Sequence, residues 1–210
     1  MDRQAVVGNG GVSAAAAAIA RGEVVAYPTE TFYGLGVDPR RPAALQRLLE
    51  LKGREERDKP LLLLAAGLED LAPWVGALPP GFDRLAARFW PGPLTLVVPA
   101  ATGIAAPLLG PSGGIAVRLT PHPLARRLIR ACGTAITGTS ANHSGEPPAR
   151  TAAAVAEAFG GARVHVLDGG ETPGGAPSTI IELSERGTAR LLRAGVLDTA
   201  LVGRVIELSG

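Results

Sequence analysis

Oxygen-bearing side chains follow a short apolar stretch near the start of the sequence. Residues 24–27 are apolar enough for a buried strand, and Pro28, which has no backbone N–H to donate, is expected to end it. Residues 29–31 (Thr-Glu-Thr) then place two hydroxyls and a carboxylate on adjacent positions, before the expected turn glycines Gly34 and Gly36. Because open α/β sheets bind ligands at the ends of their strands, this stretch predicts a polar binding edge.

The lysines of the chain are confined to one charged loop. Of the 21 basic residues only Lys52 and Lys59 are lysine, and both lie in residues 52–60 (Lys-Gly-Arg-Glu-Glu-Arg-Asp-Lys-Pro). An ammonium group is a compact point charge that the planar guanidinium of arginine does not reproduce. We therefore interpret these lysines as ligand-binding residues, with a solvated surface loop as the alternative.

A third polar stretch follows a strand expected at residues 134–137. Residues 138–145 read Gly-Thr-Ser-Ala-Asn-His-Ser-Gly, which resembles part of a serine-hydrolase nucleophile elbow but lacks the second glycine of G-x-S-x-G. We favour a non-covalent role, in which Ser140, Asn142 and Ser144 alternate along an extended loop and face one ligand. An ordinary Ser/Asn turn is the alternative.

Alternating helices and strands are expected to position these residues. Apolar periodicity, caps and Pro/Gly boundaries predict helices at 13–21, 42–52, 68–75, 82–90, 121–130, 151–159 and 198–206, with Thr120 and Thr151 as caps. They predict strands at 24–27, 61–64, 94–98, 115–119, 134–137, 164–167, 178–183 and 189–193. The last two strands form a hairpin, so the sequence predicts an α/β fold with a mixed sheet.

Composition excludes several classes of protein. The 210 residues are 46% hydrophobic, with a formal net charge of +2, which is too mild to indicate a nucleic-acid-binding protein. The single cysteine, Cys132, excludes a disulfide framework or a zinc cluster and suits a reducing cytoplasm. No apolar run approaches the length of a membrane span, and neither common glycine-rich phosphate loop is present.

A series of motifs resembles the YrdC-type threonylcarbamoyl-AMP synthases, in the order found in that family. The matching segments are residues 27–36 (Tyr-Pro-Thr-Glu-Thr-Phe-Tyr-Gly-Leu-Gly), 52–54 (Lys-Gly-Arg), 59–61 (Lys-Pro-Leu), 90–95 (Trp-Pro-Gly-Pro-Leu-Thr), 116–118 (Ala-Val-Arg), 139–145 (Thr-Ser-Ala-Asn-His-Ser-Gly) and 178–180 (Ser-Thr-Ile). They cover roughly residues 11–195. The chain resembles the short form of the family, and residues 1–210 are expected to form a single YrdC-like domain.

The resemblance implies a fold and a reaction. The fold is a twisted, largely open mixed sheet flanked by helices, of the YrdC/RibB-like kind, with a deep basic cavity. The reaction joins L-threonine, bicarbonate or CO2, and ATP into threonylcarbamoyl-AMP and pyrophosphate, with Mg2+ accompanying the ATP. A partner transferase then modifies an adenosine beside the anticodon of tRNA, and a direct tRNA or RNA contact of this chain is left open.

The resemblance also implies roles for particular residues. It gives catalytic roles to Lys52, Arg54 and Arg118. It places Lys52, Arg54, Ser140, Asn142 and Arg193 at the nucleotide, and Thr29, Thr31, Lys59, Arg118, Gly138 and Ser178 at the threonine. No residue is expected to be a dedicated metal ligand.

The sequence departs from the family pattern at two positions, and two alternative functions remain open. Glu55 occupies a position where the family usually has proline, and Gly114 one where threonine is common. One alternative is an RNA-binding paralogue that uses a basic face, formed by Arg118, Arg126, Arg127 and Arg130. The other is a carbamoyl-AMP-forming relative that acts on carbamoyl phosphate.

Overall fold

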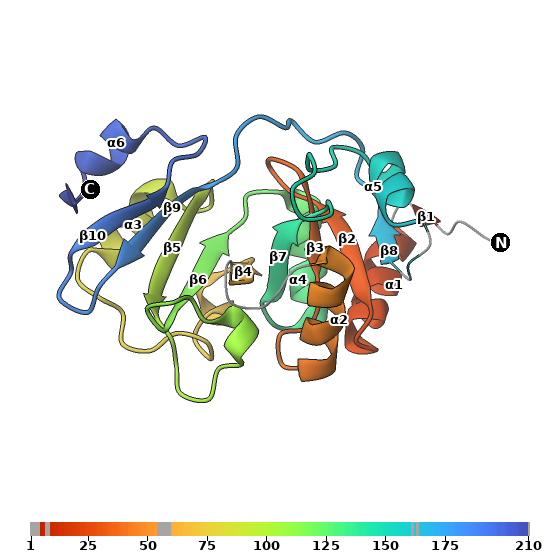
Figure 1. Cartoon of the computed structure of the whole chain (residues 1–210), viewed down its shortest axis with the longest axis horizontal. Helices are drawn as coiled ribbons and strands as arrows, with labels where there is room; N and C mark the ends of the chain where they lie inside the picture. The colour runs from red at the N-terminus through yellow and green to blue at the C-terminus, as the bar shows by residue number, and fades with distance from the viewer. Residues whose placement is uncertain (1–4, 7–8, 54–59, 161, 163, 210) are drawn as a thin grey trace.

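A computed structural model describes residues 5–6, 9–53, 60–160, 162 and 164–209 (Figure 1). Across this described part of the chain, the strands form one mixed sheet in the order β1-β8-β2-β3-β7-β4-β6-β5-β9-β10-β11. The strands are β1 (Ala5–Val6), β2 (Val24–Pro28), β3 (Tyr33–Gly36), β4 (Leu62–Ala65), β5 (Leu94–Pro99), β6 (Gly114–Leu119), β7 (Ile136–Ser140), β8 (Val164–Leu167), β9 (Thr179–Leu183), β10 (Ala189–Arg193) and β11 (Leu208–Ser209).

Helices flank this sheet on both faces. They are α1 (Asn9–Ala20), α2 (Pro42–Lys52), α3 (Phe82–Phe89), α4 (Pro123–Cys132), α5 (Ala152–Ala158) and α6 (Thr199–Gly203), with 3-10 turns η1 (Leu68–Asp70) and η2 (Ala106–Leu108). Parallel pairs such as β4–β6 and β5–β9 occur beside antiparallel pairs such as β3–β7 and the β9–β10 hairpin. The predicted fold class, a mixed sheet flanked by helices, is therefore confirmed.

Two apolar clusters hold the helices against the sheet. On one face, α1 and α4 pack on Tyr27, Leu64 and Ile136. On the other face, α2, α3 and α5 pack on side chains that include Leu63 and Leu96. Since successive residues of a strand point to opposite faces, this arrangement accounts for the continuous apolar runs in the central strands.

Local signals placed some helix ends correctly and misplaced one. Pro42 stands in the first turn of α2, Gly53 ends that helix with φ of 61°, and Thr151 caps α5 by accepting from the Ala154 amide. The prediction that Thr120 caps α4 is wrong, because His122 occupies that position. Thr120 instead accepts from the His122 amide and donates to Glu30.

Three further expectations are corrected by long-range pairing and packing. The strand expected at 134–137 is β7, which extends to Ser140 because β3 and β4 pair with it on either side. Gly34 and Gly36 lie in β3 rather than in a turn. Of the helix expected at 68–75, only the short turn η1 forms.

The glycines of β3 give space to a buried tyrosine. A Cβ added to Gly36 would lie 2.7 Å from Cε1 of Tyr27, and one added to Gly34 would lie 3.4 Å from Cζ of the same ring. The Tyr27 hydroxyl donates to the Thr137 carbonyl over 2.8 Å. Tyr27 therefore joins β2 to β7 beneath the predicted binding edge.

In the described ranges, no helix is both long enough and apolar enough to cross a bilayer.

Candidate active site

The sheet brings Arg118 and Gly138 to the same face. Strand β4 lies between β6 and β7, where Leu64 pairs with Arg118 and Leu62 pairs with Gly138. Leu62 and Leu64 are two residues apart, so their partners point to the same side of the sheet. With strands about 4.8 Å apart and a rise of about 3.3 Å per residue, the two Cα atoms are about 12 Å apart. One small ligand held by the Arg118 side chain can therefore span the distance to Gly138.

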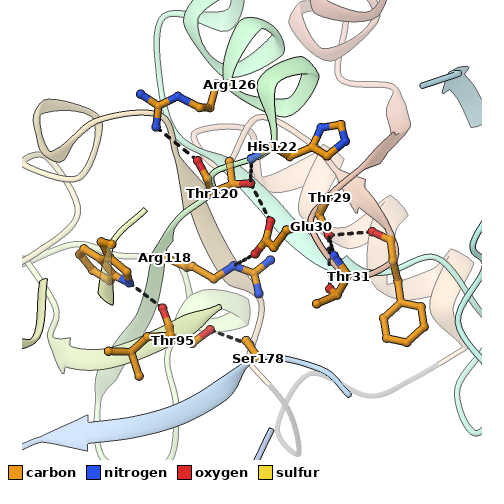
Figure 2. A network of polar contacts seen from close by, with 12 residues as sticks. Thr29, Glu30, Thr31, Thr95, Arg118, Thr120, His122, Arg126 and Ser178 are labelled. Carbon is orange, nitrogen blue, oxygen red and sulfur yellow. Dashed lines mark hydrogen bonds and ion pairs between the residues drawn. The ribbon is translucent and has the colours of Figure 1, made fainter. Parts of the chain in front are cut away.

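A network of polar contacts joins Arg118 to the segment that follows β2 (Figure 2). The Arg118 Nε lies 3.4 Å from Glu30 Oε1, and the two side chains are only 7% and 14% exposed. Thr120 Oγ1 donates to Glu30 Oε2 over 2.8 Å. The polar edge predicted at residues 29–31 and the arginine of β6 therefore meet in space, although 87 positions separate Thr31 from Arg118.

The two threonines beside Glu30 are both buried. Thr29 Oγ1 donates to the Phe32 carbonyl over 2.7 Å and accepts from the Thr31 amide over 3.3 Å. Their hydroxyl oxygens are 3.4 Å apart. This tight turn directs Glu30 toward Arg118, as Figure 2 shows.

Ser178 borders the same region on the same face of the sheet, beyond β5. Its hydroxyl lies 2.9 Å from Thr95 Oγ1, and its carbonyl accepts from Arg193 Nη2 over 2.8 Å. Partial burial and then the positive charge of Arg118 lower the pKa of Arg193, which places the two arginines within electrostatic range of each other. Thr95 was not predicted as a site residue, although it ends the family motif at 90–95 and carries a hydroxyl within an otherwise apolar strand.

Lys52, Ser140 and Asn142 also come together, at the end of β7. Lys52 Nζ donates to the Ser140 carbonyl over 2.7 Å, to the Asn142 carbonyl over 2.6 Å and to Asn142 Oδ1 over 3.1 Å. Ser140 Oγ donates to Asn142 Oδ1 over 2.5 Å. The lysine side chain is buried, whereas Ser140 remains exposed and open to a ligand.

The segment after β7 is a compact turn, and the expectation of an extended loop is wrong. The Asn142 amide N–H donates to the Ser140 carbonyl, and the Asn142 side chain donates to the carbonyls of His143 and Glu146. Asn142 therefore shapes the turn through its side chain. The expectation arose from an alternation of polar residues, which does not distinguish a strand from a folded turn.

Two parts of the predicted site lie outside the described residues. Arg54 and Lys59 fall in residues 54–59, as does the unusual Glu55. The predicted deep basic cavity stays a prediction. In the rest of the chain, no group of three His, Cys, Asp or Glu side chains is arranged to hold a metal ion.

The predicted basic face is partly wrong. Arg118 is 6% exposed and lies inside the polar network, so it does not belong to a surface patch. Arg127 and Arg130 are exposed on α4, while Arg126 is half-buried and donates to the Thr120 carbonyl. The serine-hydrolase alternative also loses support. Ser140 donates to the Asn142 side-chain oxygen, and His143 contacts the Ala158 carbonyl at the last residue of α5.

Comparisons with known proteins agree with this arrangement. The Sua5/YciO/YrdC family model, described as "Telomere recombination", matches residues 17–195. A threonylcarbamoyl-AMP synthase of Thiobacillus denitrificans is 49% identical over 174 residues, which cover 83% of this chain and 90% of that protein. One of Chromohalobacter salexigens is 45% identical over 180 residues, covering 85% and 96%.

A solved structure shows the same fold with a ligand. Sua5 of P. abyssi, crystallised with L-threonine, superposes with a TM-score of 0.86 at 39% identity, over 94% of this chain. The match covers 58% of the P. abyssi chain, which is longer. From the family match, the sequence identities and the shared fold, we conclude that the chain belongs to the Sua5/YciO/YrdC family.

Proposed function

We propose that the chain is a threonylcarbamoyl-AMP synthase. It joins L-threonine, bicarbonate or CO2, and ATP into threonylcarbamoyl-AMP and releases pyrophosphate. The observation that carries the proposal is the convergence of Arg118, Glu30 and Thr120 beside the Thr29–Thr31 turn, on the sheet whose strand β7 ends at the Lys52 cluster. Similarity to proteins named for this activity supports it.

The threonine would bind around Arg118. A guanidinium matches a carboxylate with two parallel hydrogen bonds, so Arg118 is suited to the α-carboxylate. The hydroxyls of Thr29, Thr31 and Ser178, and the backbone of Gly138, would line the site of the amine and the side-chain hydroxyl. Lys59 is kept as a further candidate from the sequence.

The nucleotide would bind near the end of β7. The exposed Ser140 hydroxyl faces solvent there, and Lys52 holds the Ser140–Asn142 turn in place while contributing positive charge close to the triphosphate. Arg193, together with Arg54, would add planar cations for phosphate oxygens. The carbamate oxygen attacks the α-phosphorus and pyrophosphate leaves, so the protein contributes positioning and charge stabilisation more than covalent chemistry.

Magnesium would enter with the substrate. The described residues offer no cluster of metal-ligating side chains, and Mg2+ in nucleotide enzymes is held largely by phosphate oxygens and water. We therefore propose that it arrives as the ATP complex. The partner transferase, the tRNA contact and a cytoplasmic location are further parts of the proposal, carried by the family resemblance and by the single free cysteine.

Incorporation of radiolabelled bicarbonate tests the proposal. The purified chain, given labelled bicarbonate, Mg2+, ATP and L-threonine, should form an acid-labile labelled nucleotide and release pyrophosphate only when all substrates are present. L-Serine should be the nearest competitor, because loss of one methyl contact is worth only about 1–3 kcal/mol. Salt-dependent RNA binding without pyrophosphate release would favour the RNA-binding alternative, and turnover of carbamoyl phosphate without threonine would favour the carbamoyl-AMP-forming one.

A further inference from the structure

Glu30 and Arg118 form a buried pair whose geometry is unusual. Their Nε–Oε1 distance of 3.4 Å brings the charges together, yet neither of these two atoms makes a hydrogen bond to any residue that the structure describes. Buried charged groups are normally both paired and hydrogen-bonded, because an unsatisfied one is costly. Electrostatic attraction therefore holds the two side chains close, and Arg118 Nε and Glu30 Oε1 can still form a shorter, hydrogen-bonded contact.

Glu30 is itself fixed by the chain beyond Arg118. Thr120 Oγ1 donates to Glu30 Oε2 over 2.8 Å, and the same hydroxyl oxygen accepts from the His122 amide over 3.1 Å. Thr120 thereby connects the Glu30 carboxylate to the start of α4, the helix that follows β6. Figure 2 shows Glu30 between the Thr120 hydroxyl and the Arg118 guanidinium.

The contact with Glu30 leaves one edge of the guanidinium available. Arg118 meets Glu30 through Nε, and no hydrogen bond to another described residue engages its two terminal nitrogens. Glu30 also supplies a negative charge directly beside the Arg118 guanidinium. A carboxylate arriving at the terminal nitrogens would find the arginine already oriented and its charge partly balanced.

We propose that Glu30 is a positioning residue that orients the Arg118 guanidinium, so that its terminal nitrogens clamp the α-carboxylate of the amino-acid substrate. This inference rests on the proposed function, in which Arg118 receives that carboxylate. Glu30 acts through the arginine and makes no contact with the substrate carboxylate itself. Its influence on binding must therefore depend on whether the ligand carries a carboxylate.

Direct binding of two ligands tests this dependence. Calorimetry with L-threonine and L-threoninamide, which lacks the carboxylate, is performed on the intact chain and on Glu30→Gln, without ATP. We expect Glu30→Gln to weaken L-threonine binding about tenfold, as loss of one charge-assisted interaction does, and to change L-threoninamide binding less than about twofold. Equal weakening of both ligands, or no change in either, would overturn the proposal.

Control variants separate positioning from a general structural effect. Glu23→Gln removes another Glu–Arg pair, the exposed one with Arg21, and should leave both affinities unchanged. Thr120→Val removes the hydroxyl that holds Glu30 and should reproduce the Glu30→Gln selectivity at smaller amplitude. In an Arg118→Lys background, Glu30→Gln should have little further effect, since the two changes remove the same clamp.

The proposed function and the positioning role of Glu30 would be refuted by different results. If the unmodified chain binds neither L-threonine nor its amide, the proposed function fails. If it binds L-threonine and prefers it over the amide, but Glu30→Gln leaves that preference unchanged, the positioning role of Glu30 alone is wrong. Full additivity of Glu30→Gln and Arg118→Lys would also exclude the positioning role.

Discussion

Replacement of Lys52 by methionine is expected to damage both stability and activity. The ammonium group is buried and donates to three oxygens at the end of β7, two of which belong to the buried Asn142. Hydrogen bonds to a charged group contribute about 1.5–3 kcal/mol each, but removal of a buried ammonium also relieves its desolvation cost. Since water can replace the contact at the exposed Ser140, we expect a net loss of about 2 kcal/mol.

Two measurements check this expectation. For a chain of this size, a loss of about 2 kcal/mol lowers the Tm by about 4–8 °C. Pyrophosphate release should fall by a further factor of about 30–1,000, which corresponds to the 2–4 kcal/mol that one charged donor typically contributes to a transition state. Differential scanning calorimetry and a coupled pyrophosphate assay provide these numbers for Lys52→Met and for the parent chain.

A cation on the same helix provides the control. Arg47 lies on the exposed face of α2 and contacts the Gly22 carbonyl, so Arg47→Ala should leave pyrophosphate release unchanged and alter the Tm by less than about 2 °C. Lost activity in Lys52→Met at an unchanged Tm would refute the anchoring role of the ammonium. Unchanged activity at a lowered Tm would refute its role in the reaction.

Three further predictions concern other parts of the fold. Arg118→Ala should lower kcat/KM for threonine by the equivalent of about 2–4 kcal/mol, and unchanged turnover would contradict the clamp. Gly36→Ala should cost about 1–3 kcal/mol in urea unfolding, because the new methyl would lie 2.7 Å from a Tyr27 ring carbon; wild-type stability would contradict this packing. Burial raises the pKa of Asp38, but the hydrogen bonds from Arg40 lower this pKa by more than burial raises it, so the net pKa is depressed. Its stabilisation, present above the usual aspartate pKa of about 4, is lost as the pH falls through the folded value; Asp38→Asn should flatten the decline in stability between pH 5 and 2, whereas an identical decline would exclude this linkage.

Local sequence signals were sufficient for much of the architecture. Pro42 and Gly53 delimit α2, and the polar residues after Pro28 do lie at the end of a strand. These features depend on the conformational limits of single residues, which act over a few positions. The same applies to Thr151, whose hydroxyl satisfies an amide three residues away.

Features that depend on distant partners were not predictable in this way. Gly36 resembles a turn glycine until Tyr27, from the neighbouring strand, is seen to occupy the space above it. Thr120 has the ordinary signature of a helix cap, yet its hydroxyl serves Glu30, 90 positions earlier. Both cases require knowledge of strand order, which sequence periodicity does not contain.

A crystal structure with L-threonine and a non-hydrolysable ATP analogue would test whether the Arg118 network and the Lys52 cluster form one active site. We expect the threonine carboxylate to lie within hydrogen-bonding distance of the Arg118 terminal nitrogens, with Glu30 still at Nε. We also expect the phosphates to lie at the Ser140–Asn142 turn, with the threonine amine facing the α-phosphate. Threonine bound away from Arg118, or a nucleotide bound on the opposite face of the sheet, would contradict this arrangement of the active site.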